Sequence, residues 1–211
     1  MLEIILARHG ETDWNAAEIF RGTVDVALNE TGIKQAALLG EYLSKFDIDA
    51  VYSSPLQRAL KTAGAIAGLH ALEVNTAYGL IDFDYGEWQG LSHQEVRERY
   101  QELYAGWINH PDRVRMPAGE SLADVRERAV ALVDGIVAGC GAGRVVLVSH
   151  RVVQKVLICA LLGLDNSHFW NVKLDTCGIT SFCHERGRFI LTRYNDTSFL
   201  QSISGAPLAD F

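Results

Sequence analysis

The sequence predicts an α/β protein with a mainly parallel central sheet flanked by helices on both faces. Short apolar runs alternate with longer segments whose apolar residues recur at helical spacing, as in chains that build parallel sheets. The continuous apolar run at 145–148 is typical of a strand buried on both faces. Two strand-like segments flank Glu185-Arg186-Gly187 and predict a closing C-terminal β-hairpin.

The elements of the first half follow from the same periodicity. Apolar residues predict strands, and an aperiodic stretch with a glycine and scattered charges predicts a long loop, which in a compact domain is usually functional. The expected elements are a strand at 2–7, a loop at 10–30, a helix at 31–46, a strand at 50–52, a helix at 56–68 and a third strand at 72–74.

The second half begins with a loop rich in glycine and aromatic residues. Ser92 and Glu95 then have the spacing of a capping box. The expected elements are a loop at 79–91, a helix at 92–107, a surface loop at 109–119, a helix at 121–139, a strand at 145–148, a helix at 152–162 and hairpin strands at 178–184 and 188–194. We expect a single domain over 1–211, with 79–119 as an insertion or lid over one end and 202–211 as a mobile tail.

Composition limits the classes of function. With 211 residues, 48% hydrophobic and 21% charged, the chain can bury one full core without disulfides or metals. The net charge of -7 argues against nucleic acid or an anionic membrane as partner, although a local cationic pocket remains compatible with it. The sequence lacks a Cys-x-x-Cys pair, a secretory leader and an apolar stretch of membrane-spanning length, so we expect a cytoplasmic protein. Oligomeric state stays open, a homodimer included.

Polar side chains follow three predicted strands where each strand ends. Arg8-His9 follows the first strand, Ser53-Ser54 follows the second with Arg58 in the next helical turn, and Ser149-His150 follows the strand at 145–148. Ligands of open α/β sheets bind outside the carboxyl ends of the strands. If these strands are parallel, one edge of the sheet carries two arginines and two histidines.

Such a cluster needs an anion to balance it, and phosphate is the natural candidate. Each residue alone has a simpler interpretation. Arg58 would be a surface residue, His150 a core histidine and Asp82 a turn former. The coincidence of three strand ends favours the phosphate site.

These residues carry a resemblance to a known family. The stretch from Arg8 to Thr12, followed by Asn15, resembles the signature of the histidine phosphatase superfamily, the phosphoglycerate mutase-like proteins. Further blocks similar to those of the family are Gly22 with Asp25, 28–36, 52–59, 86–90, 119–122 and 148–150. The resemblance implies the phosphoglycerate mutase-like fold.

It also implies roles for individual residues. His9 would be the nucleophile that becomes phosphohistidine, while Arg8, Arg58 and His150 would bind the phosphoryl oxygens. Neither a metal nor another cofactor is expected, because arginines supply the charge and the chain shows no metal-ligand spacing. The expected substrate contacts are Gly10, Glu11, Thr12, Asn15, Arg21, Gly22 and Arg151.

Two departures from the family pattern concern proton donation and specificity. Asp82 stands where the family usually has a glutamate that protonates the leaving group, with Asp84 and Glu87 as rival donors. Arg151 stands where many relatives have glycine. It either reaches the pocket rim and favours a substrate with another anionic group, or points to solvent at a helix start; Arg21 is a similar rim candidate.

The resemblance leaves a choice between phosphatase and mutase. Phe83-Asp84 replaces the Arg-His pair that follows the proton donor in mutases, and the stretch to Gly119 is compact. Both features favour a phosphomonoesterase that acts on a small soluble phosphate ester. The alternatives are a 2,3-bisphosphoglycerate-dependent phosphoglycerate mutase and, because of Asp82, a phospho-ligand-binding protein without turnover.

Overall fold

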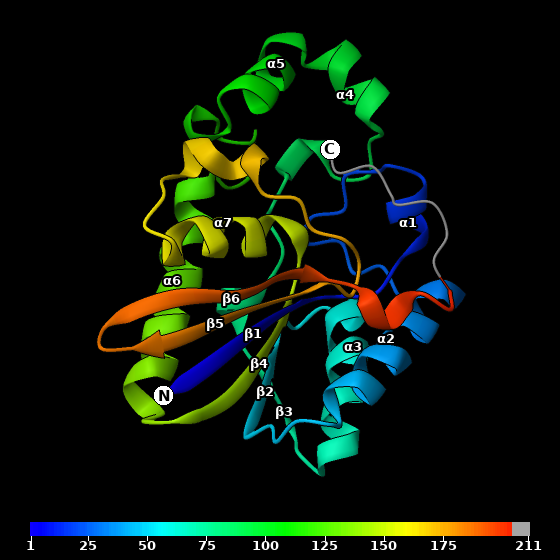
Figure 1. Cartoon of the computed structure of the whole chain (residues 1–211). Helices are drawn as coiled ribbons and strands as arrows, with labels where there is room; N and C mark the ends of the chain where they lie inside the picture. Colours follow the sequence, from blue (N-terminus) through cyan, green and yellow to red (C-terminus); the bar gives the residue numbers. More distant parts are fainter. Residues whose placement is uncertain (204–211) are drawn as a thin grey trace.

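The computed structural model describes residues 1–203, so the predicted tail lies outside the described residues except for its first two positions. A six-stranded sheet forms the centre of the molecule, with strand order β3-β2-β4-β1-β5-β6 (Figure 1). The strands are β1 (Leu2–Arg8), β2 (Ala50–Ser53), β3 (Val74–Thr76), β4 (Gly143–Ser149), β5 (Ile179–Glu185) and β6 (Arg188–Asp196). The first four are parallel, whereas β5 and β6 form an antiparallel hairpin at one edge. The predicted fold class and closing hairpin are confirmed.

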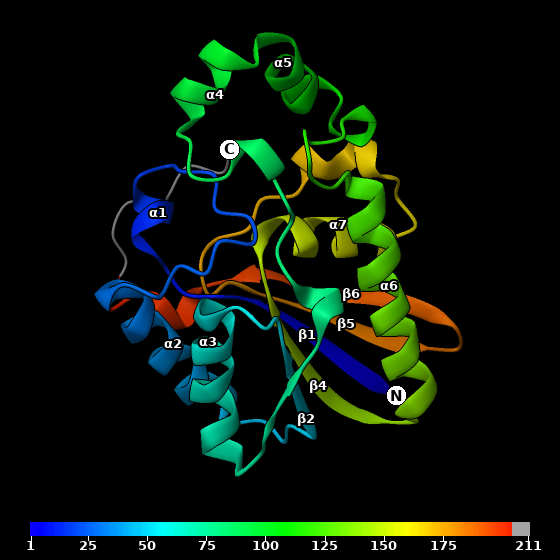
Figure 2. The same cartoon turned by 180° about the vertical axis from the view of Figure 1, so that it is seen from behind.

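Helices cover both faces of this sheet (Figures 1 and 2). The side chains of β1 alternate between two cores, as the pleat requires. Ile5 and Ala7 pack with residues of α2 (Glu30–Leu43) and α3 (Gln57–Ala67). Ile4 and Leu6 pack with residues of α6 (Leu122–Gly139) and α7 (Arg151–Leu161).

The strand register aligns the three polar strand ends. Arg8 at the end of β1 pairs with Ser149 at the end of β4, and Ser53 of β2 pairs with the neighbouring Val148. The predicted convergence at one edge of the sheet is therefore confirmed.

The loop after β1 packs tightly against the start of α2. The backbone of Glu11 donates to the side chain of Gln35 at 2.8 Å, and Asn29 caps α2 by accepting from the Gly32 amide at 2.8 Å. A Cβ on Gly32 would lie 2.1 Å from the Glu11 carbonyl oxygen, so only glycine allows this approach. The block at 28–36 thus supports the loop that follows His9.

The prediction of one helix at 92–107 is wrong. The segment forms α4 (His93–Arg99) and α5 (Gln101–Asn109), with Tyr100 between them outside helical geometry. Tyr100 packs its ring 6.0 Å from that of Trp88 and donates its hydroxyl to Glu87 at 3.0 Å. These tertiary contacts interrupt a helix that local periodicity would continue. Figures 1 and 2 show α4 and α5 at one end of the molecule, away from the strands.

Short elements complete the described chain. The predicted loop at 10–30 contains one helical turn, and the remaining connections include short 3-10 helices. These elements are α1 (Asp13–Ala16), η1 (Gly68–His70), η2 (Tyr78–Leu80), η3 (Gly86–Trp88), η4 (Pro111–Arg113), η5 (Asn166–Asn171) and η6 (Ser198–Leu200). Within 1–203, no helix combines the length and apolar character needed to cross a membrane.

Candidate active site

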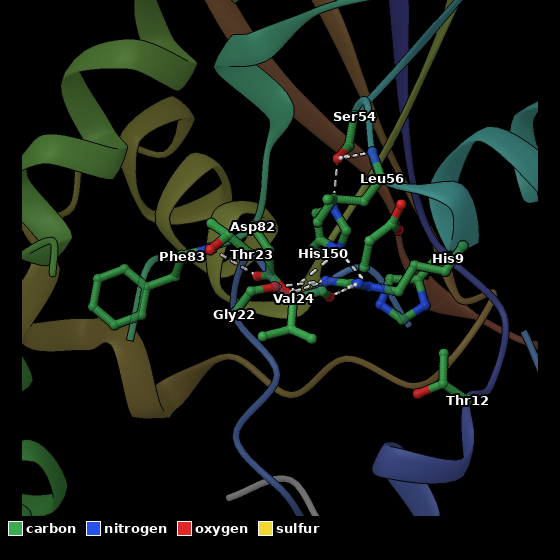
Figure 3. A network of polar contacts seen from close by, with 12 residues as sticks. His9, Thr12, Gly22, Thr23, Val24, Ser54, Leu56, Asp82, Phe83 and His150 are labelled. Carbon is green, nitrogen blue, oxygen red and sulfur yellow. Dashed lines mark hydrogen bonds and ion pairs between the residues drawn. The ribbon is translucent and has the colours of Figure 1, made fainter. Parts of the chain in front are cut away.

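Five buried polar side chains meet at the carboxyl edge of the parallel strands, and we call them the five-residue cluster: Arg8, His9, Arg58, Asp82 and His150. Each is at most 5% exposed. The rings of His9 and His150, both labelled in Figure 3, lie 5.0 Å apart. Arg58 donates hydrogen bonds to both His150 and Asp82. The structure thus brings together all five residues predicted to be catalytic.

His9 is held as a neutral imidazole with a defined tautomer. Its Nδ1 lies 2.6 Å from the Gly10 carbonyl oxygen, which can only accept, so Nδ1 carries the proton. Nε2 is then unprotonated, and it is fully buried without a hydrogen-bond partner among residues 1–203. Burial, and then the neighbouring His150 and arginines, hold the pKa of His9 well below its ordinary value. This nitrogen is available as a nucleophile at neutral pH.

Arg58 is fixed by the long loop that precedes α2. Its guanidinium donates to the carbonyl oxygens of Val24 and Gly22, each at 2.8 Å. The same loop caps α3, because Asp25 accepts from the amide of Gln57 at 2.8 Å. The motif residues Gly22 and Asp25 therefore hold the loop against the helix that carries Arg58.

His150 is oriented from both ring nitrogens. Nε2 lies 2.7 Å from Ser54 Oγ, and Nδ1 lies 3.3 Å from Arg58 Nε. Because Arg58 can only donate, Nδ1 accepts and the proton is on Nε2. Burial, followed by the charge of Arg58, holds the pKa of His150 well below its ordinary value, in agreement with a neutral ring.

Asp82 points into the five-residue cluster. Its Oδ2 accepts from Arg58 Nη2 at 3.0 Å and lies 3.4 Å from His150 Nδ1. Its Oδ1 accepts from the Phe83 amide at 2.9 Å. Arg128 of α6 donates to the Asp82 carbonyl at 3.2 Å and pairs with Glu120 at 2.9 Å, which fixes the loop that carries Asp82.

The rival proton donors lie elsewhere. Asp84 accepts from the Gly86 amide at 2.8 Å, where it forms a turn. Glu87 is exposed and accepts from the hydroxyl of Tyr100. Of the three carboxylates considered, Asp82 is the one that contacts Arg58 and His150.

A pocket of about 540 Å³, including space open to solvent at its mouth, lies against the cluster, with Arg8 and Asp82 in its lining. Four of the predicted substrate contacts also line it: Asn15, Arg21, Gly22 and Arg151. The other three do not. Gly10 accepts from His9, Glu11 accepts from Asn29 at 2.9 Å, and Thr12 caps α1. Contact of these three with substrate stays a prediction.

Two loops far apart in sequence build the pocket walls. Gly22 has a φ of +56°, and its Cβ position would lie 2.9 Å from the Phe83 carbonyl oxygen, so the loops approach closely. Gln89 accepts from the Thr23 amide at 2.6 Å, and the Gly90 amide donates to the Phe20 carbonyl at 2.8 Å.

Sequence reasoning missed seven residues that line the pocket: Trp14, Glu18, Ile19, Phe20, Tyr85, His93 and Val152. The rings of Phe20 and His93 lie 4.2 Å apart, and those of Phe20 and Tyr85 lie 4.9 Å apart. The aromatic composition of 79–91 could have pointed to Tyr85. His93 gave only a helix-start signal, and Phe20 gave none. Burial and nearby Arg151 lower the pKa of His93 to about 4, so its ring adds no charge at neutral pH.

The buried histidines make stability depend on pH. His9 and His150 stay neutral when folded but bind protons in the unfolded chain below a pKa near 6.5, so acidification favours unfolding. We expect the free energy of unfolding to fall between pH 7 and pH 5, by at most about 1.4 kcal/mol per pH unit for each histidine. Urea unfolding at several pH values measures this slope. His9→Ala should make it shallower, whereas His110→Gln, at an exposed position, should not. An unchanged slope in His9→Ala would contradict this account.

Fold and cluster together define an α/β enzyme with a cationic, phosphate-sized site at the carboxyl edge of its sheet. The chain belongs to the histidine phosphatase superfamily (branch 1), whose family model matches residues 4–197. It is accordingly a hydrolase of phosphate monoesters. Among residues 1–203, no three His, Cys, Asp or Glu side chains are grouped as a metal site would require.

Relatives of this family are similar over nearly the whole chain. Phosphoserine phosphatase 1 of Hydrogenobacter thermophilus is 38% identical over 200 residues, which cover 95% of each chain. The metal-independent phosphoserine phosphatase of Arabidopsis thaliana is 31% identical over 204 residues, covering 95% of this chain and 84% of the relative. The solved structure of phosphoserine phosphatase from Entamoeba histolytica with 3-phosphoglyceric acid has a TM-score of 0.83 and 32% identity, covering 95% of this chain and all of that one.

Proposed function

We propose that the protein hydrolyses a small soluble phosphate ester through a phosphohistidine on His9, without a metal ion. The observation that carries the proposal is the tautomer of His9, whose Nδ1 donates to Gly10 and leaves Nε2 unprotonated among cationic groups. The relatives named phosphoserine phosphatases support a phosphoamino acid or a similar small ester as substrate.

In the first step, Nε2 of His9 attacks phosphorus and the bond from phosphorus to the ester oxygen breaks. Arg8 and Arg58 hold the equatorial oxygens, where the negative charge lies during phosphoryl transfer, and His150 positions Arg58 by accepting a hydrogen bond from its Nε. Asp82 gives its proton to the departing alkoxide, which leaves as the alcohol. Asn15 lines the pocket and adds a neutral donor, because its amide oxygen already accepts from Thr12.

In the second step, water attacks the phosphohistidine. The Asp82 carboxylate accepts a proton from that water as the oxygen–phosphorus bond forms and the nitrogen–phosphorus bond breaks. Inorganic phosphate leaves, and both His9 and Asp82 return to their starting protonation states. One carboxyl group thus serves as acid and then as base.

We expect turnover of p-nitrophenyl phosphate to survive treatment with EDTA, since arginines supply the charge that a metal would otherwise provide. Orthovanadate, which adopts a pentacoordinate geometry, should inhibit. Steady-state assays before and after chelation measure the first effect. Loss of activity in EDTA that added Mg²⁺ restores would overturn the metal-independent mechanism.

Two further assays separate this function from its alternatives. Exchange between 3- and 2-phosphoglycerate, primed by 2,3-bisphosphoglycerate and faster than hydrolysis, would favour a mutase. Binding of inorganic phosphate without acid-labile label on rapid quenching would favour a phospho-ligand-binding protein. A hydrolase shows transient labelling of the protein and stoichiometric release of phosphate.

A further inference from the structure

Two arginines line the pocket beyond the five-residue cluster, Arg21 and Arg151, and we call them the rim arginines. The mechanism above gives them no role, because Arg8 and Arg58 already provide donors for a phosphoryl group. Their place in the lining excludes the alternative in which Arg151 simply points to solvent.

Arg21 has donor capacity that the protein does not use. Its side chain is half-buried, and its Nε atom is fully buried without a hydrogen-bond partner among residues 1–203. Burial lowers the pKa of Arg21 to about 9, so the guanidinium is still charged at neutral pH. A buried, charged donor without an acceptor is costly, and a bound anion would satisfy it.

Arg151 is held at the pocket by a rigid partner. Its guanidinium hydrogen-bonds the hydroxyl of Tyr85. The Tyr85 ring is only 4% exposed and packs edge-on against Phe20, Phe83 and Trp107. Because Tyr85 cannot move freely, it positions Arg151 at the pocket wall.

The charges that line the pocket do not balance. Arg8, Arg21 and Arg151 face two acidic side chains, Glu18 and Asp82. Asp82 is already engaged with Arg58, and Glu18 is exposed to solvent. A phosphate ester held by Arg8 and Arg58 therefore leaves both rim arginines facing the remainder of the substrate.

We propose that the rim arginines and Tyr85 form a second anion subsite that binds a carboxylate of the substrate, so that the preferred substrates are small carboxylated phosphate esters. Guanidinium groups pair well with the planar carboxylate. Because Arg21 and Arg151 line the same pocket as Arg8, a carboxylate a few bonds from the phosphate can reach them, as in phosphoserine and 3-phosphoglycerate. This inference rests on the proposed phosphatase function.

The test compares matched esters that differ in the carboxylate. Phosphoserine is paired with phosphoethanolamine, and 3-phosphoglycerate with glycerol 3-phosphate. In the wild type we expect kcat/KM to be about tenfold or more higher for the carboxylated member of each pair. Arg21→Gln and Arg151→Gln should each bring this ratio toward one. Tyr85→Phe, which removes only a hydroxyl, should reduce the ratio through Arg151.

Arg113→Gln is the matched control, because Arg113 is an exposed arginine that does not line the pocket, and its ratio should equal that of the wild type. The ratio is taken within each variant, so a general loss of activity does not affect it. A wild-type ratio near one, or ratios unchanged in both rim variants, would overturn the subsite while leaving the phosphatase function intact. Failure to hydrolyse any of these esters or p-nitrophenyl phosphate would instead overturn the function.

Discussion

Replacing His9 by alanine is expected to lower kcat/KM for p-nitrophenyl phosphate at least about ten-thousandfold, because removal of a nucleophile eliminates the covalent route. The imidazole has no substitute nearby. His150 is oriented by Ser54 and Arg58, with its unprotonated nitrogen occupied by the Arg58 donor. Steady-state assays at neutral pH measure the loss, and rapid quenching with labelled substrate should show no phosphorylated protein.

A measurement of phosphate binding distinguishes loss of the nucleophile from disruption of the phosphate site. Arg8, Arg58 and His150 remain in His9→Ala, so calorimetric binding of inorganic phosphate should persist. Arg58→Gln should instead weaken that binding, since it removes the guanidinium that also anchors Gly22, Val24 and Asp82. Turnover of His9→Ala at the wild-type rate would rule out the phosphohistidine mechanism.

The sequence could predict four residues of the cluster, Arg8, His9, Arg58 and His150, because strand ends are local features, whereas Asp82 was expected from the family resemblance alone. Each apolar run ends at a recognisable polar residue, and parallel pairing alone then brings Arg8, Ser53 and Ser149 to one edge. The prediction needed no knowledge of side-chain contacts. Local patterns also predicted the α/β class, from the alternation of strand-like and helical segments, and the C-terminal hairpin, from two strand-like segments around a short turn.

The features that escaped prediction depend on contacts between distant segments. Tyr100 interrupts a helix because Glu87 and Trp88 engage its side chain, and nothing within 92–107 signals this. Phe20 and His93 share a pocket wall although 73 positions separate them (93 − 20), held by backbone bonds between Phe20 and the 90–91 turn. Periodicity reports which face of an element is apolar, not which loops meet.

Asp82 is the residue on which the sequence left the largest doubt, since aspartate is one methylene shorter than the glutamate usual in the family. In the structure, hydrogen bonds to the backbone around Asp82 fix the position of the loop that carries it. Arg128 holds the carbonyl oxygens of Gly79 and Asp82 at 3.0 and 3.2 Å, and Glu120 accepts from the Asp84 amide at 3.0 Å. With the loop anchored on both sides of Asp82, the short side chain still reaches Arg58 and His150.

Asp82→Asn is therefore expected to lower kcat/KM about a hundredfold to ten-thousandfold for an alkyl ester such as phosphoserine, because the alkoxide then leaves without a proton. The loss should be much smaller for p-nitrophenyl phosphate, since nitrophenolate is a stable leaving group.

Glu87→Gln is the matched control and should leave both rates unchanged, because Glu87 is exposed and bonded to Tyr100. Equal losses on the two substrates would show that Asp82 organises Arg58 rather than donating the proton. A selective loss in Glu87→Gln would move the donor to that residue. The leaving-group dependence thus separates proton transfer from electrostatic support within a single cluster, which a simple loss of activity would not do.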